Sequence, residues 1–119
     1  MIKKSTLLPA FLAGDLTQIK ELLHPKNDGI ELSYSLALAT LEADESSLPH
    51  RLVKSSEVYF LLEGNGEMHL DEQVKEVTAG DLVFIPANAL QFIKNTGVGR
   101  LSFLCIVSPP WSPEEEVIL

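Results

Sequence analysis

The sequence predicts an all-β fold in a single domain. Its 119 residues are enough for one hydrophobic core and too few for two independently folding domains. Turn-forming residues recur about every 8 to 12 residues between short stretches with strand character, which is typical of a sandwich or barrel of antiparallel hairpins. The predicted strands are Leu32 to Leu41, Leu48 to Val53, Glu57 to Leu62, Glu67 to Leu70, Gln73 to Val77, Asp81 to Ile85, Leu90 to Lys94 and Leu101 to Val107.

One short helix is predicted near the N-terminus. Asp15 and Gln18 have the spacing of an N-cap pair, and apolar residues with helical periodicity follow until Pro25 ends the pattern. These apolar residues are Leu16, Ile19, Leu22 and Leu23. His24, at the end of this helix, is predicted to cap its C-terminus.

The chain is predicted to divide into three segments of one domain. Residues 1–33 form an N-terminal arm with the short helix, residues 34–108 form the barrel, and residues 109–119 form a C-terminal tail. The prolines of the tail lack the amide donors that a central strand needs. We therefore expect the tail to pack over the barrel or to extend freely.

Composition excludes several classes of function. Seventeen acidic residues against nine basic ones give a formal charge of -8, which repels nucleic acid and anionic membrane surfaces. No apolar run is long enough for a membrane helix. The single cysteine, Cys105, cannot form an intrachain disulfide, and a reduced cytoplasmic protein is the expectation. A mean hydropathy of +0.14 is high for so acidic a chain, and it predicts that a homodimer covers apolar surface, with the segment before Asp15 and the strand Leu32 to Leu41 as candidate contacts.

Two motifs carry the most specific signal. A His-x-His, Glu, Gly pattern is matched in spacing at His50, Glu57 and Gly64. Leu52 stands where the pattern has its second histidine. The chain resembles the cupins in this motif. The resemblance implies a double-stranded β-helix, the jelly-roll barrel of that superfamily.

The second motif follows after a hairpin. Gly80, Pro86 and Asn95 match the cupin pattern in register, whereas Asn88 stands at a glycine position and Gln91 at a histidine position. Asn95 can tie down a turn through its side chain, and Asn88 belongs to the few residue types that tolerate a positive φ. Three glycines also suit turns with a positive φ. They are Gly64, Gly66 and Gly80.

The resemblance places the metal positions of the family on His50, Leu52, Glu57 and Gln91. Residues two apart on a strand share a face, so these side chains are expected to point into the barrel. Leucine cannot ligate a metal, and an amide oxygen is a weaker donor than imidazole. The predicted ligand set is therefore His50, Glu57 and Gln91, which would hold one divalent ion (Mn, Fe, Ni or Zn) weakly.

Each of these residues also has a structural interpretation. Burial of Glu57 is costly unless the carboxylate is a ligand, a partner of His50 or hydrogen-bonded to Gln91 without a metal. His50 can equally be a buried histidine at the barrel mouth. His69 is expected to be exposed and Cys105 to be a core residue. The predicted substrate pocket contains Tyr59, Phe84 and Gln91, though such aromatic residues can also be plain core.

The sequence predicts a cupin that binds a small molecule, a sugar or an organic acid, in the mouth of the barrel. If it is an enzyme, proton transfer next to a carbonyl, as in sugar isomerisation, is expected, with Glu57 or His50 as the base. A metal-dependent oxygenase is one alternative. A noncatalytic ligand sensor or structural dimer with a decayed metal site is another, because one barrel hosts many activities.

Overall fold

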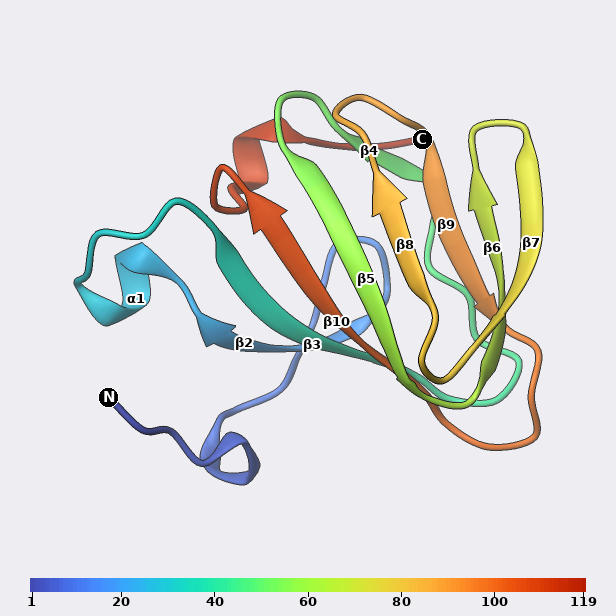
Figure 1. Cartoon of the computed structure of the whole chain (residues 1–119), viewed down its shortest axis with the longest axis horizontal. Coiled ribbons are helices and arrows are strands. Elements are labelled where there is room, and N and C mark those ends of the chain that lie inside the picture. Colours follow the sequence, from blue (N-terminus) through green and yellow to red (C-terminus); the bar gives the residue numbers. More distant parts are fainter.

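The computed structural model describes all 119 residues as a barrel of two antiparallel sheets (Figure 1). One sheet has six strands in the order β1-β2-β3-β10-β5-β8, and the other has five in the order β11-β4-β9-β6-β7. The strands are β1 (Phe11–Leu12), β2 (Gln18–Leu23), β3 (Ser35–Leu41), β4 (His50–Leu52), β5 (Ser56–Glu63), β6 (Asn65–Leu70), β7 (Gln73–Thr78), β8 (Leu82–Ile85), β9 (Gln91–Asn95), β10 (Leu101–Ser108) and β11 (Glu116–Ile118). Two 3-10 turns, η1 (Ser5–Leu7) and η2 (Pro113–Glu115), and one short helix, α1 (Pro25–Asp28), complete the chain. The all-β jelly-roll prediction is confirmed.

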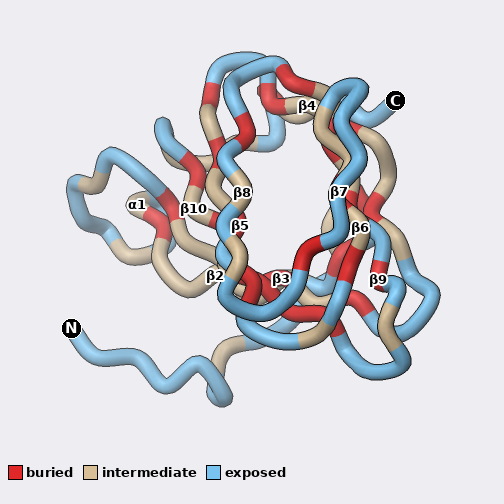
Figure 2. Tube along the Cα trace, turned by 45° about the vertical axis from the view of Figure 1, so that its right-hand side comes forward, coloured by how far each residue is buried: buried red, intermediate tan, exposed pale blue.

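All eight predicted strands are present, with ends shifted by a few residues. Their inner faces form the core, as the alternation of buried and exposed residues along β5 illustrates. In that strand Glu57, Tyr59 and Leu61 are buried, whereas Phe60 and Leu62 are exposed. Figure 2 shows buried segments concentrated where the two sheets face each other. None of the helical segments is long or apolar enough to cross a membrane.

The predicted N-terminal helix is wrong. Residues Gln18–Leu23 form strand β2, which pairs with β3 in the six-stranded sheet. Pro25 begins α1 rather than ending a helix, and Gly29 ends α1 in the left-handed conformation. His24 caps the N-terminus of α1, because its Nδ1 accepts a hydrogen bond from the Lys26 amide at 3.1 Å. The strand is favoured because pairing with β3 satisfies the backbone, which outweighs the helical spacing of a few leucines.

Glycine is needed at Gly64 and Gly66 for different reasons. Gly64 has φ +90°, and a Cβ there would lie 2.3 Å from the Arg100 carbonyl oxygen. Gly66 was expected to need a positive φ and does not have one. A Cβ at Gly66 would instead lie 3.0 Å from the Lys94 carbonyl oxygen and from a Leu101 methyl group, so close strand approach explains this glycine. Asn88 has φ +68°, as predicted.

Asn95 ties down the turn after β9. Its Nδ2 donates to the carbonyl oxygens of Leu41 at 3.0 Å and Gly99 at 2.8 Å, and its Oδ1 accepts from the Gly97 amide at 3.0 Å. The side chain is fully buried and its hydrogen bonds stabilise a conformation that spans three segments. The turn-binding role predicted for Asn95 is confirmed.

The C-terminal tail packs over the barrel and adds an edge strand. β11 pairs with β4, at the margin of the five-stranded sheet. The anchor of the tail is Glu115, which is 2% exposed. Its two carboxylate oxygens accept hydrogen bonds from the Ser55 amide at 3.0 Å and the Ser55 hydroxyl at 2.8 Å. The absence of a central strand in this proline-rich tail agrees with the prediction.

We predict that Glu115→Ala lowers the free energy of unfolding by about 1–3 kcal/mol, because it leaves the buried Ser55 amide without its acceptor, whereas the Ser55 hydroxyl keeps the Pro109 carbonyl oxygen at 2.8 Å. Urea denaturation monitored by circular dichroism measures the loss. The matched control is Glu114→Ala, at the neighbouring exposed position, which should change stability by less than about 0.5 kcal/mol. Equal effects of the two substitutions would contradict the anchoring role of Glu115.

The homodimer stays a prediction, and the N-terminal segment supports it. Apolar residues of this segment are exposed, both on the start of the chain, which extends away from the barrel (Figures 1 and 2), and on and beside the edge strand β1. They are Met1, Ile2, Leu7, Phe11, Leu12 and Leu16. β3 lies between β2 and β10, so only its outer face, and not its edge, is free for a partner.

Light scattering at micromolar concentration should give the mass of two chains, each of 13.1 kDa. Leu12→Lys should shift the mass toward one chain, because a charge at a buried apolar contact is costly. Val98→Lys, in an exposed turn, should leave the mass unchanged. The mass of one chain for the unmodified protein would contradict the dimer.

Candidate functional site

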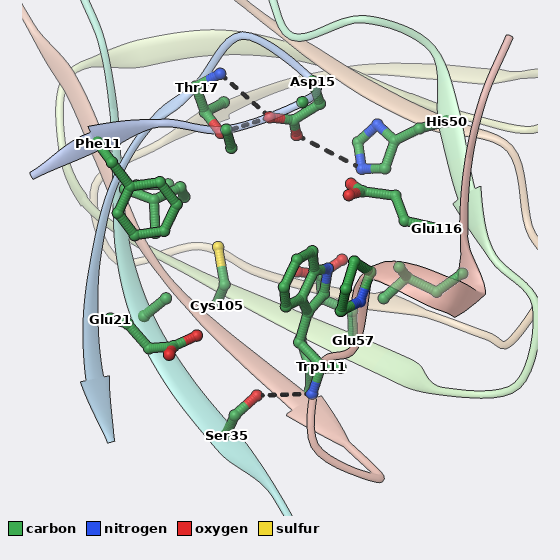
Figure 3. A pocket seen from close by; sticks show the side chains of 18 of the residues that line it. Phe11, Asp15, Thr17, Glu21, Ser35, His50, Glu57, Cys105, Trp111 and Glu116 are labelled. Carbon is green, nitrogen blue, oxygen red and sulfur yellow. Dashed lines mark hydrogen bonds and ion pairs between the residues drawn. The ribbon is translucent and has the colours of Figure 1, made fainter. Parts of the chain in front are cut away.

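A cavity of about 300 Å³ lies against the inner face of the six-stranded sheet and is also lined by both terminal segments. The barrel contributes residues of β3, β4, β5 and β10, among them His50 and Glu57. The segment around β1 contributes Phe11 and Asp15, and the C-terminal tail contributes Trp111 and Glu116. Figure 3 shows these side chains around the cavity. The site is therefore built by the barrel together with residues that precede and follow it.

The floor of the cavity contains a chain of hydrogen bonds between the two sheets. Tyr59 Oη donates to Gln91 Oε1 at 2.7 Å, and Gln91 Nε2 donates to Glu57 Oε1 at 3.0 Å. Tyr59 and Glu57 lie on β5, whereas Gln91 lies on β9 of the opposite sheet. Among the interpretations of Glu57, the hydrogen bond to Gln91 is the one that this geometry shows.

The surroundings of Glu57 favour its protonated form. Burial away from water is the main cause that raises the pKa of Glu57 to about 8, and the hydrogen bond from Gln91 opposes this shift in part. The nearby carboxylates of Asp15 and Glu116 raise the pKa further. Oε1 accepts the bond from Gln91, and the Cys105 thiol is a further hydrogen-bond partner of this carboxyl group. A carboxyl group with this pKa can donate or accept a proton near neutral pH.

His50 belongs to a second cluster, on another side of the cavity. Its Nδ1 lies 2.7 Å from the Leu48 carbonyl oxygen, and its Nε2 lies 3.6 Å from Asp15 Oδ2. One side-chain nitrogen or oxygen atom from each of Asp15, His50 and Glu116 lies within 4.8 Å of the corresponding atoms of the other two (Figure 3). Burial is also the main cause that raises the pKa of Glu116, and the Asp15 carboxylate adds to the effect.

The positions that the family uses for metal do not fit a metal as they are arranged here. Leu52 is buried and offers no donor atom. The oxygen of Gln91 that a metal would need accepts the Tyr59 hydroxyl, and its nitrogen donates to Glu57. His50 lies opposite Gln91 on neighbouring strands, but its free nitrogen faces Asp15. The predicted ligands are thus neighbours whose polar atoms are used for different contacts.

The other residues predicted from the sequence differ in whether they line the cavity. Tyr59 lines the cavity, but Gln91 and Phe84 do not. Gln91 is buried and hydrogen-bonded to Tyr59 and Glu57, which do line it. Phe84 is 56% exposed, and its neighbours Val83 and Ile85 point into the core instead. Cys105 is a buried core residue, as expected, and also lines the cavity. His69 is half-buried outside the cavity, where it stacks on Phe92 with ring centroids 4.0 Å apart.

Sequence reasoning missed the acidic residues that the terminal segments supply, Asp15 and Glu116. Asp15 is present in the sequence as a plausible helix cap, and Glu116 is the last residue of an acidic run, which usually lies in solvent. No cupin motif includes either position. The carboxyl groups beside His50 were therefore not predicted.

Comparisons with known proteins agree with the architecture. A family model described as a cupin domain matches residues 37–107. An uncharacterised protein of Methanocaldococcus jannaschii is 38% identical over 109 residues, which cover 92% of this chain and 86% of that protein. A predicted oxalate decarboxylase from Thermotoga maritima has a similar structure, with a TM-score of 0.82 and 22% identity over 92% of this chain and 99% of that one. The Streptomyces nucleoside dehydratase Pac13 gives a TM-score of 0.80 and 16% identity, with 100% of this chain and 90% of that chain covered.

The raised pKa of Glu57 predicts a pH-dependent stability. Between pH 4.5 and about 8 the folded protein keeps a proton that the unfolded chain has lost, so the free energy of unfolding falls as pH rises through this range. The slope from one such group is at most about 1.4 kcal/mol per pH unit. Glu57→Gln stays neutral, so its stability should rise relative to the unmodified protein between pH 5 and 8. Urea denaturation at several pH values tests this, and parallel stability curves would contradict it.

Proposed function

The chain belongs to the cupin family, and on this premise we propose that it binds a small, neutral, polyhydroxylated molecule such as a sugar. The proposed reaction is proton transfer at the bound molecule, with Glu57 as the group that gives or takes the proton. The observation that carries this proposal is the Glu57 carboxyl group, which is held at the cavity floor by Gln91 and Tyr59.

The charge of the cavity supports a neutral ligand. The acidic residues that line it are Asp15, Glu21, Glu57 and Glu116, and no lysine or arginine lines it. No lysine or arginine side chain is there to bind an anionic ligand, so a sugar is favoured over the organic acid that the sequence left open. Hydroxyl groups of the ligand can donate to these carboxylates.

Apolar walls supply the other half of the recognition. Phe11, Tyr59, Phe103 and Trp111 surround the cavity, and about 300 Å³ accommodates a molecule of the size of a monosaccharide. Aromatic rings bury the apolar face of a sugar ring, whereas the polar groups fix its orientation. The fold is shared with a nucleoside dehydratase, and a nucleoside contains a sugar.

The pKa of Glu57 supports the proton-transfer step. A group with a pKa of about 8 is mostly protonated at neutral pH, but its ionised form is a stronger base than an ordinary carboxylate. Removal of a proton next to a sugar carbonyl, followed by its return at the neighbouring carbon, can be carried out by one group that acts first as base and then as acid. His50, across the cavity, is the second residue that can exchange a proton with the ligand.

Calorimetry tests the ligand class. The full-length protein should bind the neutral aldoses ribose or glucose at least about tenfold more tightly than the matching aldonates, a difference of about 1.4 kcal/mol. Tighter binding of the aldonates would overturn the proposed ligand class.

Deuterium incorporation tests the reaction. In D₂O, NMR should detect exchange at the carbon next to the carbonyl of the bound sugar, and Glu57→Gln should slow it at least about a hundredfold. Glu21→Gln is the matched control, since Glu21 lines the same cavity but hydrogen-bonds with Asn27. Sugar binding without exchange would overturn the catalytic step and favour the noncatalytic sensor.

A further inference from the structure

We propose that Asp15, His50 and Glu116 form a site for a divalent metal ion such as Zn²⁺ or Mn²⁺. Of these residues only His50 occupies a metal position of the family, whereas Asp15 precedes the barrel and Glu116 follows it. The proposed site is thus shifted from the family's positions toward the terminal segments. It does not depend on proton transfer by Glu57.

The distances between the donor atoms suit an ion. His50 Nε2 and Asp15 Oδ2 are 3.6 Å apart, and the donor atoms of all three residues lie within 4.8 Å of one another. A separation of 3.6 Å is too long for a hydrogen bond. A tetrahedral ion with ligands at about 2.1 Å separates them by about 3.4 Å. The cluster therefore needs little adjustment to enclose a metal.

The ring of His50 is oriented as in a metal ligand. The Leu48 carbonyl oxygen can only accept a hydrogen bond, so Nδ1, at 2.7 Å, carries the proton in the neutral ring. Nε2 is then the nitrogen with a free lone pair, and it points toward Asp15 and Glu116 (Figure 3). His50 is only 3% exposed, and Nε2 makes no hydrogen bond. A backbone carbonyl on the other ring nitrogen is the usual support of a metal-bound histidine.

Asp15 is held in a matching way. Its Oδ1 accepts hydrogen bonds from the Thr17 hydroxyl at 2.6 Å and the Thr17 amide at 3.1 Å, which turns Oδ2 toward His50. Asp15 is 7% exposed, so this carboxylate is largely removed from water. The cluster brings two carboxyl groups to one imidazole, and no lysine or arginine lines the cavity to offset their charge. A divalent cation would supply the missing positive charge.

The donor types indicate the class of metal. One imidazole nitrogen and two carboxylate oxygens suit the borderline ion Zn²⁺ and the harder, oxygen-preferring ion Mn²⁺. Three protein ligands leave at least one coordination position free, and the cavity is where a water molecule or the bound small molecule could occupy it.

The experiment uses the full chain after removal of metals with a chelator. Calorimetric titration with Zn²⁺ and with Mn²⁺ should show one bound ion per chain. Asp15→Asn and Glu116→Gln should each weaken binding at least about tenfold, since each removes one charged ligand and keeps the side-chain size. Glu57→Gln is the matched control, because it removes a carboxylate of the same cavity outside the cluster and should change the affinity less than threefold.

Three results would overturn the proposal. One is the lack of stoichiometric binding by the folded protein, and the second is an unchanged affinity in both Asp15→Asn and Glu116→Gln. The third is a loss of binding in Glu57→Gln alone, which would place the ion at the family's positions. If Asp15→Asn fails to fold, Glu116→Gln decides the matter, because Glu116 is half-buried on an edge strand and makes no side-chain hydrogen bond that the fold needs.

Discussion

The amide of Gln91 connects the two sheets through the interior of the barrel, and the organisation of the cavity depends on this connection. Its Oε1 accepts a hydrogen bond from the Tyr59 hydroxyl, and its Nε2 donates one to Glu57, so both of these contacts lie inside the protein. A buried polar network is stabilising only when its members are satisfied, and here the chain from Tyr59 to Glu57 meets that condition. The consequence is a fixed position for the Glu57 carboxyl group. The cavity is thereby divided into a hydrogen-bonded floor and a separate cluster around His50.

Side-chain parity explains how much of this arrangement could be predicted from the sequence. The cupin motifs set the strands in register, and alternation along each strand then placed His50, Leu52, Glu57 and Gln91 on inner faces, where the structure has them. Alternation failed as a guide at Phe84. The run Leu82 to Ile85 is apolar throughout, so its sequence carries no sign of which side chains face inward.

Contacts between distant segments account for what the sequence could not show. The leucines before Pro25 have helical spacing, but the stretch becomes a strand because β3 offers it a paired edge. Asp15 enters the site through the turn between β1 and β2, and Glu116 through an edge strand on β4. Neither placement follows from local propensity or from a motif, since both depend on where the ends of the chain dock. The donors around His50 were therefore visible only in three dimensions.

Both terminal segments line the cavity, which brings together parts of the chain that lie far apart in the sequence. His24 Nε2 contacts the Trp111 carbonyl oxygen across 87 residues of sequence at 2.8 Å, a contact that forms only after a long loop has closed. The barrel and the two terminal segments therefore have separate tasks in building the site. The same separation of tasks applies to amino-acid substitutions. Substitutions in the short terminal segments can alter the polar groups that meet a ligand, while the motifs that specify the barrel stay as they are.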